Sequence, residues 1–131
     1  MYTGSCFCKK ITVELSAEPQ VVALCHCTDC RKMSGSVYSY NFIVGADDYK
    51  ISGTPEATDK IADSGNKVKN YYCKDCVAES GIIERVVINA GIFDDVREIQ
   101  NRKPSVEIYV EQRLDWVKPV EDCAQLEGMP S

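Results

Sequence analysis

The stretch from Leu24 to Lys32 reads LCHCTDCRK, and it places a C-x-C-x-x-C cluster around the only histidine of the chain, His26. The three cysteines of this cluster are Cys25, Cys27 and Cys30. Two further cysteine pairs flank the cluster in sequence: Cys6 with Cys8, and Cys73 with Cys76. Four thiolates can close a tetrahedral metal site, whereas three leave one coordination position open. The cysteine count therefore suggests one structural and one catalytic site.

Length and composition indicate a single domain over residues 1–131, with 44% hydrophobic and 27% charged residues. No apolar run reaches the ~20 residues of a membrane helix, and the N-terminus carries no signal-peptide pattern. We therefore expect a cytoplasmic protein that has no membrane partner and whose thiols stay reduced. The even number of 8 cysteines also fits disulfides. Disulfides need an oxidising compartment, so metal binding is the favoured interpretation.

The charge distribution bears on possible partners. A net charge of −5 and a pI near 4.9 argue against a nucleic-acid surface, which needs clustered lysine and arginine. Arg31 and Lys32 form a local basic spot that could hold a small anion, with Arg31 able to bind a carboxylate through two hydrogen bonds. We expect a monomer or a homodimer.

Hydrophobic periodicity predicts a mainly β fold with little helix. Strands are expected at residues 11–15, 21–27, 36–45, 49–52, 57–62, 67–72, 82–90 and 105–110. Turns are expected at residues 17–20, 28–35, 63–66, 73–76 and 93–96, the second and last of them with a short helical turn. We expect small antiparallel sheets held together by metal, with the first and last cysteine pairs meeting in space.

Taken in order, these motifs resemble the glutathione-dependent formaldehyde-activating enzyme family, which includes centromere protein V. The matching residues are Gly4-Ser5-Cys6-Phe7-Cys8, Cys25-His26-Cys27-Thr28-Asp29-Cys30-Arg31, Cys73-Lys74-Asp75-Cys76, Ala90-Gly91-Ile92-Phe93-Asp94-Asp95 and Trp116. The resemblance implies the zinc-bearing β fold called Mss4-like. It also implies a structural zinc on the outer cysteine pairs and a second zinc, linked to activity, on the central trio.

This resemblance and the open ligand position lead to a zinc-dependent carbon–sulfur lyase as the leading hypothesis. A thiol such as glutathione would bind at the open position, lose its proton and attack an aldehyde carbon, or the reverse reaction would release the aldehyde. The catalytic candidates are Cys25, Cys27, Cys30 and His26, and Arg31 is the candidate for binding the co-substrate. The alternatives are a non-catalytic zinc-binding interaction module and a zinc or redox sensor.

Several other residues have both a functional and a structural interpretation. His26 lies out of phase with the neighbouring cysteines, which favours a packed residue, although it stays a candidate general acid or base. Asp94 and Asp95 could orient a ligand or simply form a turn. Trp116 is expected in the core, and Cys123 is expected to be a free thiol or a small buried residue.

Overall fold

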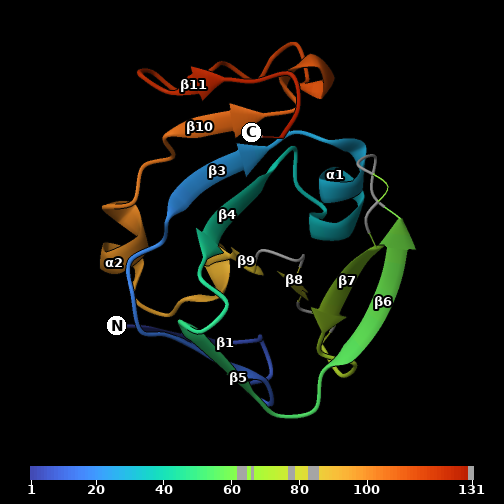
Figure 1. Cartoon of the computed structure of the whole chain (residues 1–131), viewed down its shortest axis with the longest axis vertical. Helices are drawn as coiled ribbons and strands as arrows, with labels where there is room; N and C mark the ends of the chain where they lie inside the picture. The colour runs from blue at the N-terminus through green and yellow to red at the C-terminus, as the bar shows by residue number, and fades with distance from the viewer. Residues whose placement is uncertain (62–64, 66, 77–78, 83–85, 130–131) are drawn as a thin grey trace.

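The computed structural model describes residues 1–61, 65, 67–76, 79–82 and 86–129, and its described part is mainly β (Figure 1). The strands form three small sheets. The first sheet is antiparallel and has the order β1-β2-β5, with bounds Tyr2–Ser5, Thr12–Leu15 and Tyr49–Ser52. No helix in the described part of the chain is long and apolar enough to cross a membrane.

The second sheet has five strands in the order β11-β10-β3-β4-β9. Their bounds are Ala124–Gln125, Val106–Ile108, Val21–Cys25, Ser39–Val44 and Val86–Asn89. The pairs β3·β4 and β4·β9 are antiparallel as expected, whereas β10 runs parallel to both β3 and β11. The helix α2 (Val96–Gln100) lies in the connection that carries the chain from β9 back across the sheet to β10. The parallel neighbours β10 and β11 are joined by the long connection of residues 109–123, since parallel strands cannot be joined by a tight turn.

The third sheet is antiparallel and consists of β6 (Glu56–Ile61), β7 (Lys67–Tyr72) and β8 (Glu79–Ile82). The single strand predicted at residues 82–90 is wrong. Residue 82 ends β8 of this sheet, while β9 of the five-stranded sheet begins at residue 86. The hairpin loop predicted at residues 63–66 lies outside the described residues except for residue 65.

The main core lies between the first sheet and one face of the five-stranded sheet. Phe42 of β4 is completely buried at its centre, with ring centroids 5.5 Å from Tyr2 and 5.6 Å from Phe93. Side chains of β3 alternate between the two faces of its sheet. Val22 faces this core, whereas Ala23 and Cys25 face a second cluster with Val106 and Ile108. The strand therefore aims Cys25 away from the main core.

The described helices are short, and only short helical turns were predicted for them from the sequence. The predicted turn at residues 28–35 contains a full α-helix, α1 (Thr28–Ser34), which ends at Gly35 with a left-handed φ of 68°. The predicted turn at residues 93–96 lies between the 3-10 helix η1 (Ala90–Ile92) and α2. A second 3-10 helix, η2 (Val110–Gln112), follows β10.

Gly4 allows β1 to lie directly against η1. A Cβ atom at this position would lie 2.1 Å from the carbonyl oxygen of Ile92, which is backbone and cannot turn aside. Gly4 also forms an isolated β-bridge with Phe93. Because Gly4 lies two residues before Cys6, this close approach fixes where the first cysteine pair begins.

We predict that Gly4→Ala destabilises the protein by about 1–3 kcal/mol or more, because the new methyl group overpacks against backbone. Gly91→Ala is the matched control, since a Cβ there meets no atom within 4 Å. The control should be neutral or slightly stabilising. Urea unfolding of the metal-loaded proteins measures both changes, and equal stability of the two variants would contradict the argument.

Candidate metal centres

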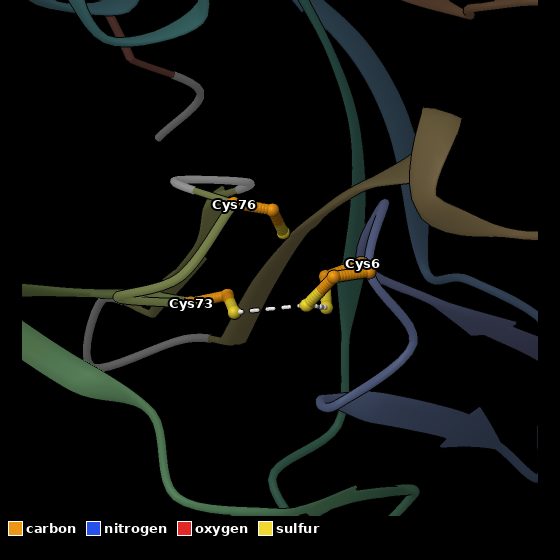
Figure 2. A group of neighbouring side chains, drawn as sticks. Cys6, Cys73 and Cys76 are labelled. Atoms are coloured by element: carbon orange, nitrogen blue, oxygen red, sulfur yellow. Dashed lines mark hydrogen bonds between the residues drawn. The ribbon is translucent and has the colours of Figure 1, made fainter.

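Four cysteines from two distant parts of the chain meet at one point, and we call them the quartet: Cys6, Cys8, Cys73 and Cys76. The first two follow β1 and the last two follow β7, so the site joins the first and third sheets. The Sγ atom of Cys8 lies 3.7 Å from that of Cys6 and 3.6 Å from that of Cys73. Figure 2 shows the side chains of Cys6, Cys73 and Cys76 pointing toward one another.

The first half of the quartet is shaped by a tight turn between β1 and β2. The amide of Cys6 donates to the carbonyl of Ile11 at 2.9 Å, and the amide of Ile11 donates to Sγ of Cys6 at 3.3 Å. Lys9 adopts a left-handed φ of 68° within this turn. Cys6, Ile11 and Cys73 are buried together, while Cys8 is exposed. The quartet therefore lies at the edge of the molecule with half of its ligands packed.

The donor set of the quartet fits a tetrahedral metal ion. Four thiolates around zinc at 2.3 Å lie about 3.8 Å from one another. The Sγ–Sγ distances of 3.6 Å (Cys8 to Cys73) and 3.7 Å (Cys8 to Cys6) agree with that value, and all four Sγ atoms lie within 4.8 Å of one another. The cysteine pairs expected to meet therefore do so, in a geometry that could hold a metal ion.

A second group of sulfur atoms lies at the end of β3, and we call it the trio: Cys25, Cys27 and Cys30. Their Sγ atoms also lie within 4.8 Å of one another. Cys25 is buried, while Cys27 and Cys30 are half-buried. The strand predicted to reach Cys27 ends at Cys25, because the chain then enters α1. The trio could hold a metal ion on three protein ligands and be reached from solvent on one side.

Helix α1 brings the last two cysteines of the trio together. Cys27 is its N-cap residue, and its Sγ atom accepts a hydrogen bond from the amide of Cys30 at 3.3 Å. Sulfur is a poor hydrogen-bond acceptor when neutral and a better one as a thiolate, so this cap suits a charged Cys27.

The three thiols of the trio share charge unequally. Hydrogen bonds from the thiols of Cys25 and Cys30 hold the pKa of Cys27 far below its usual range. The hydrogen bonds of Cys25 with the thiol of Cys27 and, to a smaller extent, with that of Cys30 raise the pKa of Cys25, and burial raises it further. These interactions favour the thiolate form at Cys27, the member that is also the helix cap.

His26 lies between two cysteines of the trio but does not join their ligand group among the described residues. Its side chain is completely buried, and Nε2 lies 2.8 Å from Oε1 of Glu107 on β10. Burial works to raise the pKa of Glu107, but its hydrogen bonds, led by the one from Gln125, outweigh burial and lower it. Glu107 is therefore a carboxylate and His26 the donor. This position supports the packed interpretation of His26, while its acid–base role stays a prediction.

Residues of other elements contact the sequence neighbours of the trio cysteines, and these residues were not predicted from the sequence. Glu107 reads as one polar residue of an alternating strand, yet β10 is an interior strand with all three residues buried. Oε1 of Gln112 accepts hydrogen bonds from the amide and the hydroxyl of Thr28, at 2.8 and 3.0 Å. Lys60 of β6 forms an ion pair with Asp29 of α1. The one signal in the sequence was the position of Glu107, an acidic residue between the apolar residues Val106 and Ile108.

The remaining predicted residues lie in structural positions. Asp95 caps α2, because its Oδ1 accepts from the amide of Arg97 at 2.9 Å, and it also pairs with the Arg97 side chain. The expectation that Trp116 lies in the core is wrong, since it is 70% exposed. The tail packs onto the five-stranded sheet through Leu126 instead. Cys123 is a half-buried free thiol outside the quartet and the trio.

Comparisons with known proteins agree with this geometry. Residues 1–112 match the family model described as glutathione-dependent formaldehyde-activating enzyme. None of the curated proteins matches the chain. A crystal structure of a Rhodobacter sphaeroides protein is similar at a TM-score of 0.55 and 17% identity, over 74% of this chain and 94% of that one. At this identity the similarity to the Rhodobacter protein concerns the fold.

We predict that Cys73→Ser removes one metal ion per chain and strongly lowers the midpoint of unfolding. Structural zinc supplies about 10 kcal/mol or more of folding free energy in small zinc domains, and a serine hydroxyl is a poor replacement for a thiolate ligand. Cys123→Ser is the control, because Cys123 belongs to neither group of sulfur atoms. Metal content is measured by mass spectrometry on protein purified without chelator. Full metal content in Cys73→Ser would contradict a site at the quartet.

Proposed function

We propose, from the premise that this chain belongs to the glutathione-dependent formaldehyde-activating enzyme family, that it is a zinc-dependent enzyme acting on thiol adducts of aldehydes. The observation that carries the proposal is the trio, whose three sulfur atoms lie within 4.8 Å of one another with two of them half-exposed. A module used only for binding needs the quartet alone, so a second group with only three donors, one fewer than a closed site needs, calls for a chemical role.

The two groups of sulfur atoms would divide the work. The quartet offers four thiolates, a closed set that suits a structural zinc. The trio offers three and leaves the fourth position to a substrate sulfur, since soft thiolates favour zinc. When bound there, zinc would act as a Lewis acid that lowers the pKa of a thiol and stabilises its thiolate.

The reaction that fits this site forms or breaks one carbon–sulfur bond. In the forward direction the thiolate sulfur bonds to the carbonyl carbon of the aldehyde, and the proton released by the thiol ends on the carbonyl oxygen. The product is a hemithioacetal, and the reverse reaction returns thiol and aldehyde without any oxidant or reductant. Glutathione with formaldehyde is the first substrate pair to test, in line with the family description.

Arg31 of α1 is the candidate for holding the co-substrate. It follows Cys30 directly, it is half-buried, and its Nη2 donates to Oγ1 of Thr28 at 3.2 Å. Its Nε is buried without a hydrogen-bond partner among the described residues. A guanidinium group on the residue that follows Cys30, half-buried and bonded to Thr28, is suited to a carboxylate, and glutathione carries two.

A redox sensor is the second candidate, and the same sulfur atoms favour it. Three close thiols, two of them half-exposed, could exchange a metal ion for a disulfide under oxidation. Mild peroxide that releases one metal ion reversibly, from a protein that does not change the rate of adduct formation, would favour the sensor.

We predict that Cys27→Ser abolishes the acceleration of hemithioacetal formation from glutathione and formaldehyde. The variant removes one of the three sulfur atoms of the trio and the cap of α1, so the second metal ion should be lost while the quartet keeps its own. Exchange NMR measures the rate of adduct formation, and Cys123→Ser is the control. An unchanged rate of adduct formation in Cys27→Ser would contradict the mechanism.

We also predict that Arg31→Ala raises the KM for glutathione about 10- to 100-fold and leaves kcat nearly unchanged. Loss of a charge-assisted hydrogen bond of about 1.5–3 kcal/mol gives a change of this order, and it affects binding more than chemistry. Lys32→Ala is the control, because Lys32 is the exposed neighbour and its loss changes the net charge equally. A lower kcat at constant KM would assign Arg31 to the reaction step instead.

A further inference from the structure

Glu107 is a buried carboxylate whose two oxygen atoms are both occupied. Oε1 faces Nε2 of His26, and Oε2 accepts from the backbone amide of Val120 at 3.0 Å. Oε2 also accepts from Nε2 of Gln125 at 2.6 Å and from Nη2 of Arg113 at 3.1 Å. A buried charge is tolerated only when its hydrogen bonds are satisfied, so every partner of this carboxylate faces it as a donor.

The orientation of His26 depends on this carboxylate. Its other ring nitrogen, Nδ1, is buried and has no hydrogen-bond partner among the described residues. The ring packs edge-on against Tyr38 at 5.6 Å between centroids. The backbone is held from the same strand, because the amide of His26 donates to the carbonyl of Ile108 at 3.1 Å. Glu107 therefore supplies the polar anchor of the residue that links Cys25 to Cys27.

The residue on the other side of Cys27 is held by the same segment of chain. Gln112 accepts both hydrogen bonds that Thr28 donates from its amide and its hydroxyl. Between Glu107 and Gln112 the chain bends sharply at Tyr109, which adopts a left-handed φ of 54° and packs against the cluster that includes Cys25. A left-handed non-glycine residue is strained and persists only where its surroundings fix it. Residues 107–112 thus fasten both neighbours of Cys27.

We propose that Glu107 is a positioning residue of the trio: by fixing His26, it sets the relative positions of the Cys25 and Cys27 sulfur atoms and so the affinity of the trio for metal. The inference rests on the proposed metal site at the trio but not on the reaction carried out there. Groups that orient metal ligands typically change metal affinity 10- to 100-fold when they are removed. The quartet, which is built from other elements, should be indifferent to the change.

Glu107→Gln is the variant that tests the proposal. The glutamine side chain has the same shape, but its NH₂ group would face a donor at one of the two oxygen positions. In competition with a chromogenic chelator, we expect the affinity for one of the two metal ions to fall about 10- to 100-fold, while the affinity for the other stays as in the parent protein. Glu111→Gln is the matched control, because it removes the same charge from an exposed position in the same segment.

The visible absorption of the cobalt-substituted protein distinguishes a change at the trio from a general loss of structure. The difference between the absorption spectra of the parent protein and Cys27→Ser defines the visible bands of cobalt at the trio. In Glu107→Gln these bands should shift or weaken, and the bands of the quartet should stay. Gln112→Ala is a second variant that loosens the other neighbour of Cys27 from an exposed position, and it should weaken the same bands with less risk to folding.

The outcomes separate this inference from the proposed function. A parent protein that holds a single metal ion, unaffected by Cys27→Ser, would overturn the metal site and the positioning role together. Two metal ions retained equally in Glu107→Gln and Gln112→Ala would overturn the positioning role alone. Parallel loss of both metal ions in both variants would show a general structural role and would also overturn it.

Discussion

The arrangement of this molecule depends on four sulfur atoms that meet at one point. Strand β6 of the third sheet contributes no side chain to a hydrophobic core, because all six of its residues are exposed. The third sheet contacts the rest of the molecule through Cys73 and Cys76 of the quartet, through the ion pair between Lys60 and Asp29, and through β8, which lies against β9 of the five-stranded sheet. In a chain of 131 residues, a metal ion held by the quartet would add to the order that the hydrophobic core provides.

The quartet and the trio share donor chemistry but differ in their supports. The quartet is formed by turns at the edges of two sheets, and a metal ion there ties separate parts together. The trio grows from the end of β3, an interior strand whose two neighbours are both paired with it. Sites on regular elements hold their geometry more precisely than sites on loops. The supports therefore match a structural role for the quartet and a chemical one for the trio.

Much of this could be predicted from sequence, because cysteine spacing is a strong and local signal. The two ligand groups and most strands follow from it and from period-two patterns. The failures share a cause, which is that pairing between distant segments decides burial. The run at residues 82–90 reads as one strand, yet residue 82 ends a strand of the third sheet and residues 86–89 form a strand of the five-stranded sheet. Trp116 is apolar and aromatic, yet it lies outside because the tail packs through other residues.

Glu107 shows most clearly what sequence can and cannot supply. An acidic residue in an alternating strand is ordinarily assigned to the solvent face, and only the parallel pairing of β10 with β3 and β11 buries it. A buried ionic network is weak evidence for stability, because well-packed apolar residues of similar volume often serve as well or better. Such a network makes sense where a fixed geometry matters more than stability. Here it ends on His26, between two cysteines of the trio. That placement is the reason to assign Glu107 a part in shaping the trio rather than in packing alone.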